Sequence, residues 1–262
     1  NPGRQVELCD YGNDVPVGNI NVLASDDATL KINAAQGSFA GNLAGGLSIG
    51  VAVVDKNVKA MAENLYAYSK GLNIDAQNLG YVLTTANGVA GSGTGALAGS
   101  AAETIVSYTT DAHLGAHATV HASVLDDSGK LVGGSAQINA KSSFEHVGEA
   151  AGLAGSGTVA IGLSNDTTYL TQDTRAYVGK EAWLSADKGI AVHAEHTTDI
   201  TNAVVAGGFA GTVAVNGGVG VNKLRDTTLA FVDEGAKLWL HGTTDASGKA
   251  AVIDISAMDT TT

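Results

Sequence analysis

Three histidines have the spacing that most directly suggests chemistry. His113, His117 and His121 recur at every fourth residue, so on one extended strand their imidazoles face the same side. Imidazole is a good ligand for Zn²⁺ and Ni²⁺. A strand rises ~3.3 Å per residue, however, which separates neighbouring histidines by roughly 13 Å, too far for one ion. We therefore expect exposed polar positions here and no metal site.

Two glycine-rich motifs resemble catalytic or nucleotide-binding loops. Residues 46–50 read Gly-Leu-Ser-Ile-Gly, the pattern of the nucleophile elbow of α/β-hydrolases, which also needs a strand–turn–helix context. The corresponding stretch of a later repeat, residues 208–212, contains no serine. Residues 91–95 read Gly-Ser-Gly-Thr-Gly without the Lys-Ser/Thr ending of a phosphate loop, and similar stretches occur in other copies. We predict packing roles for both motifs, with no catalytic serine and no nucleotide cofactor.

Acidic pairs are the remaining candidates for chemistry. Asp26 with Asp27, and Asp126 with Asp127, resemble the paired carboxylates of a glycosidase or lyase, but both pairs fall in predicted turns, where Asp is common for backbone reasons. Residues 217–224 match one calcium β-roll repeat with Asn in place of Asp, whereas calcium needs several stacked turns that supply carboxylates. We therefore predict no catalytic, cofactor-binding or metal-ligating residues, and a protein that is not an enzyme.

The elements that would position these residues are repeated strands. A pentapeptide with small or aliphatic residues at alternate positions recurs along the chain, which is the period of a half-buried strand. Its copies are residues 30–34, 72–76, 136–140, 190–194 and 253–257. A partner strand precedes most copies, at residues 20–24, 65–69, 118–122, 182–186 and 238–242. The links between partners are predicted turns rich in Asp and Gly, at residues 25–27, 70–71, 126–129, 187–189 and 245–248.

Longer segments repeat with the same offsets. Residues 90–94 recur as residues 154–158, so each unit is a strand, a turn, a strand, a Gly/Ala-rich stretch and a polar run. At roughly 20–30 residues per coil, one copy would contain two coils. Residues 203–221 carry no charge and are long enough to cross a bilayer, but their alignment with other copies predicts a buried pair of coil strands. One short helix is expected near residues 56–64.

Composition limits the function classes. The 262 residues include 35 Gly, only 5% aromatic residues and a formal net charge of −12. This charge opposes binding to nucleic acid or anionic lipid through a general electrostatic field. The single cysteine, Cys9, excludes an internal disulfide framework. Because the chain begins without Met and stops inside a repeat, we interpret it as a segment of a longer array.

The Val/Ile-x-Ala strands, Asp/Gly turns and A-G-G or A-G-S-G-T stretches resemble the very large secreted β-helical exoproteins of bacteria. They are most similar to leukotoxin-type filamentous adhesins, which are relatives in style of filamentous haemagglutinin. The resemblance covers nearly all of residues 20–262, while residues 1–19 carry none of it. It implies an all-β fold, a right-handed parallel β-helix over residues 20–262, with residues 1–19 as an N-terminal cap or linker.

The function implied by this resemblance is a structural and adhesive one. The expected protein is a rigid rod, secreted or on the bacterial cell surface, whose outer Thr, Asn, Asp and His side chains contact a protein or glycan ligand on a host or neighbouring cell. End-to-end self-association is a further expectation, and membrane insertion is not expected. Two alternatives stay open: a β-helical polysaccharide lyase or glycosidase, and a cytotoxin segment whose Gly/Ala stretches contact membrane.

Overall fold

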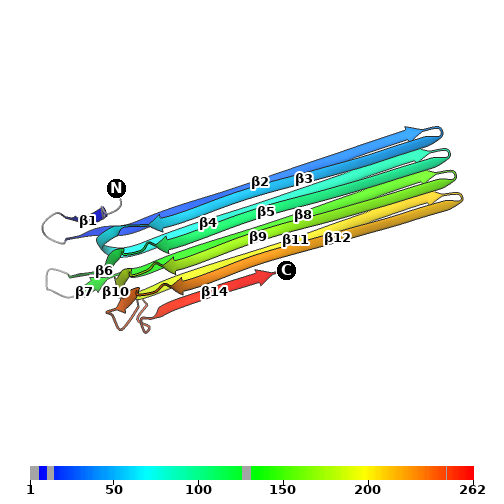
Figure 1. Ribbon diagram of the computed structural model, residues 1–262. Coiled ribbons are helices and arrows are strands. Elements are labelled where there is room, and N and C mark those ends of the chain that lie inside the picture. Colours follow the sequence, from blue (N-terminus) through cyan, green and yellow to red (C-terminus); the bar gives the residue numbers. More distant parts are fainter. Residues whose placement is uncertain (1–5, 11–14, 126–130, 246) are drawn as a thin grey trace.

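The computed structural model describes residues 6–10, 15–125, 131–245 and 247–262, and every element in this part of the chain is a strand (Figure 1). The all-β prediction is therefore confirmed. The strands are β1 Val6–Asp10, β2 Val15–Ala40, β3 Leu43–Ala62, β4 Leu65–Ser92, β5 Gly95–Leu114, β6 Thr119–Leu125, β7 Leu131–Gly133, β8 Ser135–Ser156, β9 Val159–Val178, β10 Trp183–Ala186, β11 Gly189–Ala210, β12 Val213–Val232, β13 Lys237–Leu240 and β14 Ile253–Thr261.

Each coil runs out along one long strand, makes a tight turn, and returns along a second long strand (Figure 1). The outgoing strands pair in parallel in the order β2-β4-β8-β11-β14, which we call the first long sheet. The returning strands pair in parallel in the order β3-β5-β9-β12, the second long sheet. Each strand thus pairs with its equivalent in the next coil, so the fold is solenoid-like.

The register shows that one sequence copy makes one coil. Ile20, Leu72, Ala136, Ile190 and Ile253 occupy equivalent positions in the first long sheet. The prediction of two coils per copy is therefore wrong, because each copy supplies one long outgoing strand and one long returning strand, as β4 and β5 do.

The same long strands explain an error in the first copy. Residues 30–34 were expected to align with residues 72–76, but Ala24 is the partner of Ala76, and Ala34 is the partner of Ala86. Two similar alternating segments lie ten residues apart in β2. A period of two gives an acceptable match at any even shift, so the sequence pattern alone selects the wrong one.

Short strands close one end of each coil. β6, β10, β13 and the start of β4 pair in parallel, and β1 joins them at Val6 and Leu65. Four predicted partner strands are therefore confirmed, while residues 20–24 belong to the first long sheet. Of the predicted turns, residues 187–188, 245 and 247–248 lie between strands, and residues 25–27 and 70–71 lie within β2 and β4. Residues 126–129 and 246 lie outside the described part. The helix expected near residues 56–64 is wrong, because β3 continues to Ala62.

The core lies between the two long sheets, where alternate side chains point inward. Ile138 is fully buried, whereas its neighbour Asn139 is only half-buried. Close to the short strands the core consists of aliphatic side chains from both sheets, including Ile74, Leu114, Val178 and Val192. Towards the tight turns it consists of small residues, namely Ala44, Ala90, Ala96, Ala98, Ala154 and Ala160.

Glycine allows the coils to stack at the tight turns. A Cβ on Gly93 would collide with the carbonyl oxygen of Gly41, and a Cβ on Gly157 would collide with that of Gly93. The backbone N–H of Gly93 donates to the same Gly41 oxygen at 3.0 Å. Close backbone approach therefore explains the recurring glycine in these turns.

Candidate functional site

The three histidines do not share a strand. His113 lies at the end of β5, His117 occupies a corner with a φ of 58°, and His121 lies in β6. His113 is buried and its Nδ1 lies 2.6 Å from Asp111 Oδ1, while His117 Nδ1 lies 3.2 Å from Glu181 Oε2. The expectation of exposed positions holds for His117 and is wrong for His113, because the chain turns between them.

His121 is held separately from the other two imidazoles. Its Nδ1 lies 2.9 Å from the Ser185 hydroxyl, and its ring stacks on Tyr68 with 4.9 Å between centroids. Burial lowers the pKa of His121, and His241 acts in the same direction. The corner thus disperses the three histidines among different partners.

The two glycine-rich motifs have structural surroundings of different kinds. Ser48 lies in the middle of the 20-residue strand β3 and is 5% exposed, so residues 46–50 lack the strand–turn–helix geometry of a nucleophile elbow. Residues 91–95 include the tight turn between β4 and β5, at Gly93 and Thr94, which stacks on the turn of the preceding coil. The packing interpretation of the second motif agrees with this placement.

The acidic residues that resembled a catalytic pair or a calcium site are not brought together in the described part of the chain. Asp26 lies within β2 and forms an ion pair with Lys56, and Asp27 is exposed. Neither residue is in a turn, so that prediction is wrong for this pair: the extended strand continues through it. Asp126 and Asp127 lie outside the described residues. Residues 217–224 are continuous strand in β12 rather than a β-roll turn.

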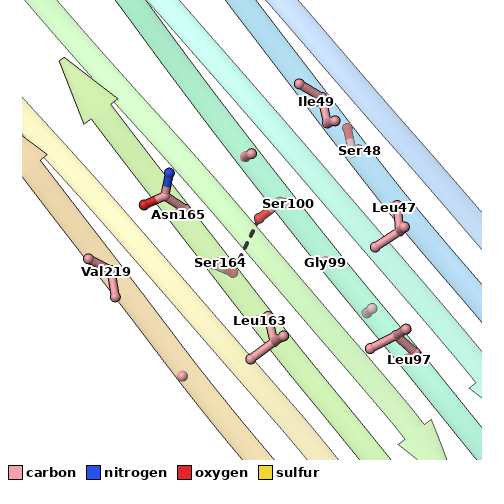
Figure 2. A pocket seen from close by; sticks show the side chains of 13 residues that line it. Leu47, Ser48, Ile49, Leu97, Gly99, Ser100, Leu163, Ser164, Asn165 and Val219 are labelled. Carbon is pink, nitrogen blue, oxygen red and sulfur yellow. Dashed lines mark hydrogen bonds between the residues drawn. The ribbon is translucent and has the colours of Figure 1, made fainter. Parts of the chain in front are cut away.

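The outer side of the second long sheet carries exposed apolar side chains, several of which are labelled in Figure 2. In one row across the four strands, leucine alternates with glycine: Leu47, Gly99, Leu163 and Gly217. A Cβ on Gly99 would lie 2.7 Å from Leu47 Cδ2, so each leucine leans over the glycine of the next coil. We call this surface the outer apolar face; its large exposed members are Leu47, Ile49, Leu97, Leu163, Val215 and Val219.

A shallow groove of about 490 Å³ crosses the outer apolar face. Leu47, Leu97 and Leu163 form its sides, and Gly99 keeps its floor low (Figure 2). Beneath it, the Ser100 hydroxyl donates to Ser164 Oγ at 3.2 Å, and the Ser164 hydroxyl donates to the Val205 carbonyl at 2.6 Å. These inward serines are satisfied by the neighbouring coil and the opposite sheet, which leaves apolar groups to line the groove.

Charge is excluded from this end of every coil. The uncharged segments are residues 32–54, 76–102, 150–165 and 200–222, and they contain the four tight turns. The outer apolar face was not predicted from the sequence, because apolar residues were assigned to the core only. The signal was present, since residues 43–53 are apolar or glycine at every outward position. The expected outer surface of Thr, Asn, Asp and His is therefore wrong for this end.

A second polar region lies inside the solenoid. One inward position of the first long sheet is polar in every coil and faces a similar position of the second long sheet. We call these positions the interior polar row: Asp26, Asn78, Ser142, His196 and Asp259 on the first sheet, and Lys56, Tyr108, Gln172 and Asp226 on the second. Burial and Asp26 together raise the pKa of Tyr108 to about 12.

Among the described residues, the interior polar row contains the group with metal-ligand geometry. One donor atom from each of His196, Asp226 and Asp259 lies within 4.8 Å of the other two. The prediction from the sequence was that no residue binds a metal, and this group was therefore not expected. A signal for two of the three residues was available, because His196 and Asp259 each follow the closing alanine of a repeat by two residues.

No protein-family model, curated protein or solved structure matches the chain. Within the described residues, no helix has the length and apolar character needed to cross a bilayer.

Proposed function

We propose that the chain is a structural and adhesive segment of a large secreted bacterial surface protein. In this proposal the stacked coils are a right-handed parallel β-helix that acts as a rigid rod. The outer apolar face is the contact surface for a protein or glycan ligand on a host or neighbouring cell. Localisation outside the cell belongs to the same proposal.

The observation that carries the proposal is the continuity of the outer apolar face across four coils. Leu47, Leu97, Leu163 and Val219 come from four different strands and are between 41% and 61% exposed. Contiguous apolar surface of this kind marks interaction sites in soluble proteins. A flat, repeated surface suits attachment along a rod, since successive coils add contact area without a separate binding domain.

The test is binding of the labelled chain to cells, matrix-coated wells and glycan arrays, with a Leu47→Asn/Leu163→Asn variant. We expect this variant to bind more weakly, because it removes the sides of the groove. Thr171→Asn is the matched control, since Thr171 is exposed on the same sheet away from the face. Equal binding by all three proteins, or depolymerisation of a polysaccharide by the chain, contradicts the proposal.

Contact with a lipid surface is a second candidate, favoured by the uncharged tight-turn ends. In β9 the uncharged stretch from Val159 to Asn165 spans about 20 Å at ~3.3 Å per residue, which is about two-thirds of the thickness of a bilayer's hydrocarbon core. Phe39 and Phe209 add exposed aromatic surface on the first long sheet. Flotation with phosphatidylcholine vesicles tests this candidate, and a chain that remains in the dense fraction contradicts it.

A further inference from the structure

The end of the interior polar row brings three ligand-type side chains together from three strands. His196 in β11 and Asp259 in β14 are register partners, and Asp226 reaches them from β12 in the opposite sheet. His196 Nε2 lies 3.8 Å from Asp226 Oδ2. Zn²⁺ bonds of ~2.1 Å place neighbouring tetrahedral ligand atoms about 3.4 Å apart. Small side-chain rotations would therefore bring the donor atoms of the three residues to the distances that a bound ion requires.

The group is buried on one side and open on the other. His196 is 1% exposed, Asp226 is half-buried and Asp259 is exposed. A metal ion therefore has an approach past Asp259, while the imidazole is fixed in the interior. This increase in exposure from His196 to Asp259 is typical of a metal site that is formed by the fold and remains accessible to solvent.

Polar atoms at the site lack hydrogen-bond partners within the described part of the chain. His196 Nδ1 and Asp226 Oδ1 are both buried without a partner. One coil earlier, Ser142 and Gln172 occupy the equivalent positions; each is 1% exposed, and Ser142 Oγ and both amide atoms of Gln172 are also unpartnered. Buried polar groups of this kind are costly unless they are hydrogen-bonded or coordinate an ion. They are a second, independent indication of a polar ligand at this position.

The electrostatics suit a cation. Asp226 and Asp259 contribute two carboxylates to a group whose donor atoms lie within 4.8 Å of one another, so the group concentrates negative charge. No Lys or Arg occupies an inward position beside the group in the described β11, β12 and β14 segments, since Lys223 and Arg225 lie at outward positions of β12.

Threonine hydroxyls orient the ligands. The Thr228 hydroxyl donates to Asp259 Oδ2 at 3.1 Å, and the Thr261 hydroxyl to Asp259 Oδ1 at 3.4 Å. Such outer contacts hold metal-binding side chains in position at protein metal sites. Thr198 Oγ1 lies 2.7 Å from His196 Nε2, so an ion bound at this nitrogen replaces the threonine contact.

We propose that His196, Asp226 and Asp259 bind a divalent transition-metal ion, with Zn²⁺ as the best match. One imidazole nitrogen and two carboxylate oxygens are ligands that Zn²⁺ accepts in tetrahedral geometry, with a fourth position open to solvent. Ca²⁺ prefers six to eight oxygen ligands and fits this set less well. The bound ion joins β14 to the preceding coil through both long sheets, so its role is to stabilise the stacked coils, independently of any contact made by the outer apolar face.

The test is calorimetric titration of the EDTA-dialysed chain with ZnCl₂ and, separately, with CaCl₂. We expect one Zn²⁺ per chain, a raised melting temperature with Zn²⁺, and weaker binding of Ca²⁺. Asp259→Asn should weaken Zn²⁺ binding at least about tenfold. Because Asp259 is exposed, this variant should keep its fold, which circular dichroism verifies. Co²⁺ provides an optical readout, and the visible absorption of the bound ion should be lost in His196→Gln.

His193→Gln is the matched control. His193 Nε2 lies 3.1 Å from Asp254 Oδ2 on the same two strands, at half-exposed outward positions. Its removal should leave Zn²⁺ affinity and stoichiometry unchanged. The proposal is overturned by wild-type protein without saturable Zn²⁺ binding, by unchanged binding in folded Asp259→Asn, by loss of binding in His193→Gln, or by tighter binding of Ca²⁺ than of Zn²⁺. All of these results are independent of the adhesion assays.

Discussion

Lys56 Nζ lies 2.7 Å from Asp26 Oδ1, and the two side chains differ greatly in exposure, at 6% for Lys56 and 47% for Asp26. The ammonium group also donates to the Leu79 carbonyl at 2.8 Å and lies 5.2 Å from the centre of the Tyr108 ring. The interior polar row therefore begins with a buried cation whose neutralising partner is at the surface.

This asymmetry predicts unequal effects of removing the two partners. Asp26→Asn leaves a buried ammonium unpaired and should lower the free energy of unfolding by about 1–3 kcal/mol. Lys56→Met leaves an aspartate that water can solvate, so it should cost less than Asp26→Asn. Chemical denaturation of both variants measures the difference, with the exposed neighbour Asp27→Asn as the control. A larger loss for Lys56→Met than for Asp26→Asn would show that the buried ammonium does not need its partner.

The stacked glycines predict that the loss of stability on replacing a glycine by alanine depends strongly on its position in the tight turn. Gly157→Ala should destabilise the chain by about 1–3 kcal/mol, because its Cβ would collide with the Gly93 carbonyl oxygen. Gly155→Ala, two residues earlier, is the matched control, since a Cβ there meets nothing within 4 Å. That variant should be neutral or stabilising by a few tenths of a kcal/mol. Similar melting temperatures for the two variants would contradict close stacking.

Asp166 predicts a pH dependence of stability. It is fully buried, and burial raises its pKa to about 6, although the Asn202 side chain and the Thr167 backbone lower it. Because the folded-state pKa lies above the unfolded-state value, the folded state binds the proton more tightly. The contribution of Asp166 to the free energy of unfolding is therefore largest below about pH 4. It declines as the pH rises to about 6 and stays low above that pH.

Replacement of Asp166 should remove this decline. Asp166→Asn should be near wild type at pH 4 and more stable at pH 8 by on the order of 2 kcal/mol. Urea denaturation at both pH values measures the effect, and the exposed Asp199→Asn serves as the control. A variant that is equally destabilised at pH 4 and pH 8 would show that Asp166 stays ionised in the fold.

The sequence predicted strand type better than strand length or register. Alternation correctly placed Ile138 inward and Asn139 outward, because period two fixes the face of a strand locally. It failed to join residues 20–24 to residues 30–34, which both belong to β2, since the polar Asp26 and Asp27 between them look like a turn. The site residues were harder to find. Asp226 lies opposite His196 because of where the tight turn between β11 and β12 falls, and the spacing of the repeats does not give that position.

The open edge of β12 predicts self-association. In the described residues β12 pairs with β9 alone, and such an edge is a template for another strand. Asn222 is exposed there, although its equivalents Thr168 and Thr104 are fully buried one and two coils earlier. A second copy stacked on β12 would therefore bury Asn222.

Asn222→Lys should prevent stacking by placing an unpaired charge in the new core, whereas outward-facing Thr227→Lys should not. Light scattering at high protein concentration and high salt, which screens the net charge of −12, distinguishes these outcomes. A wild-type chain that stays monomeric under those conditions, or one whose association survives Asn222→Lys, excludes the β12 edge as the contact.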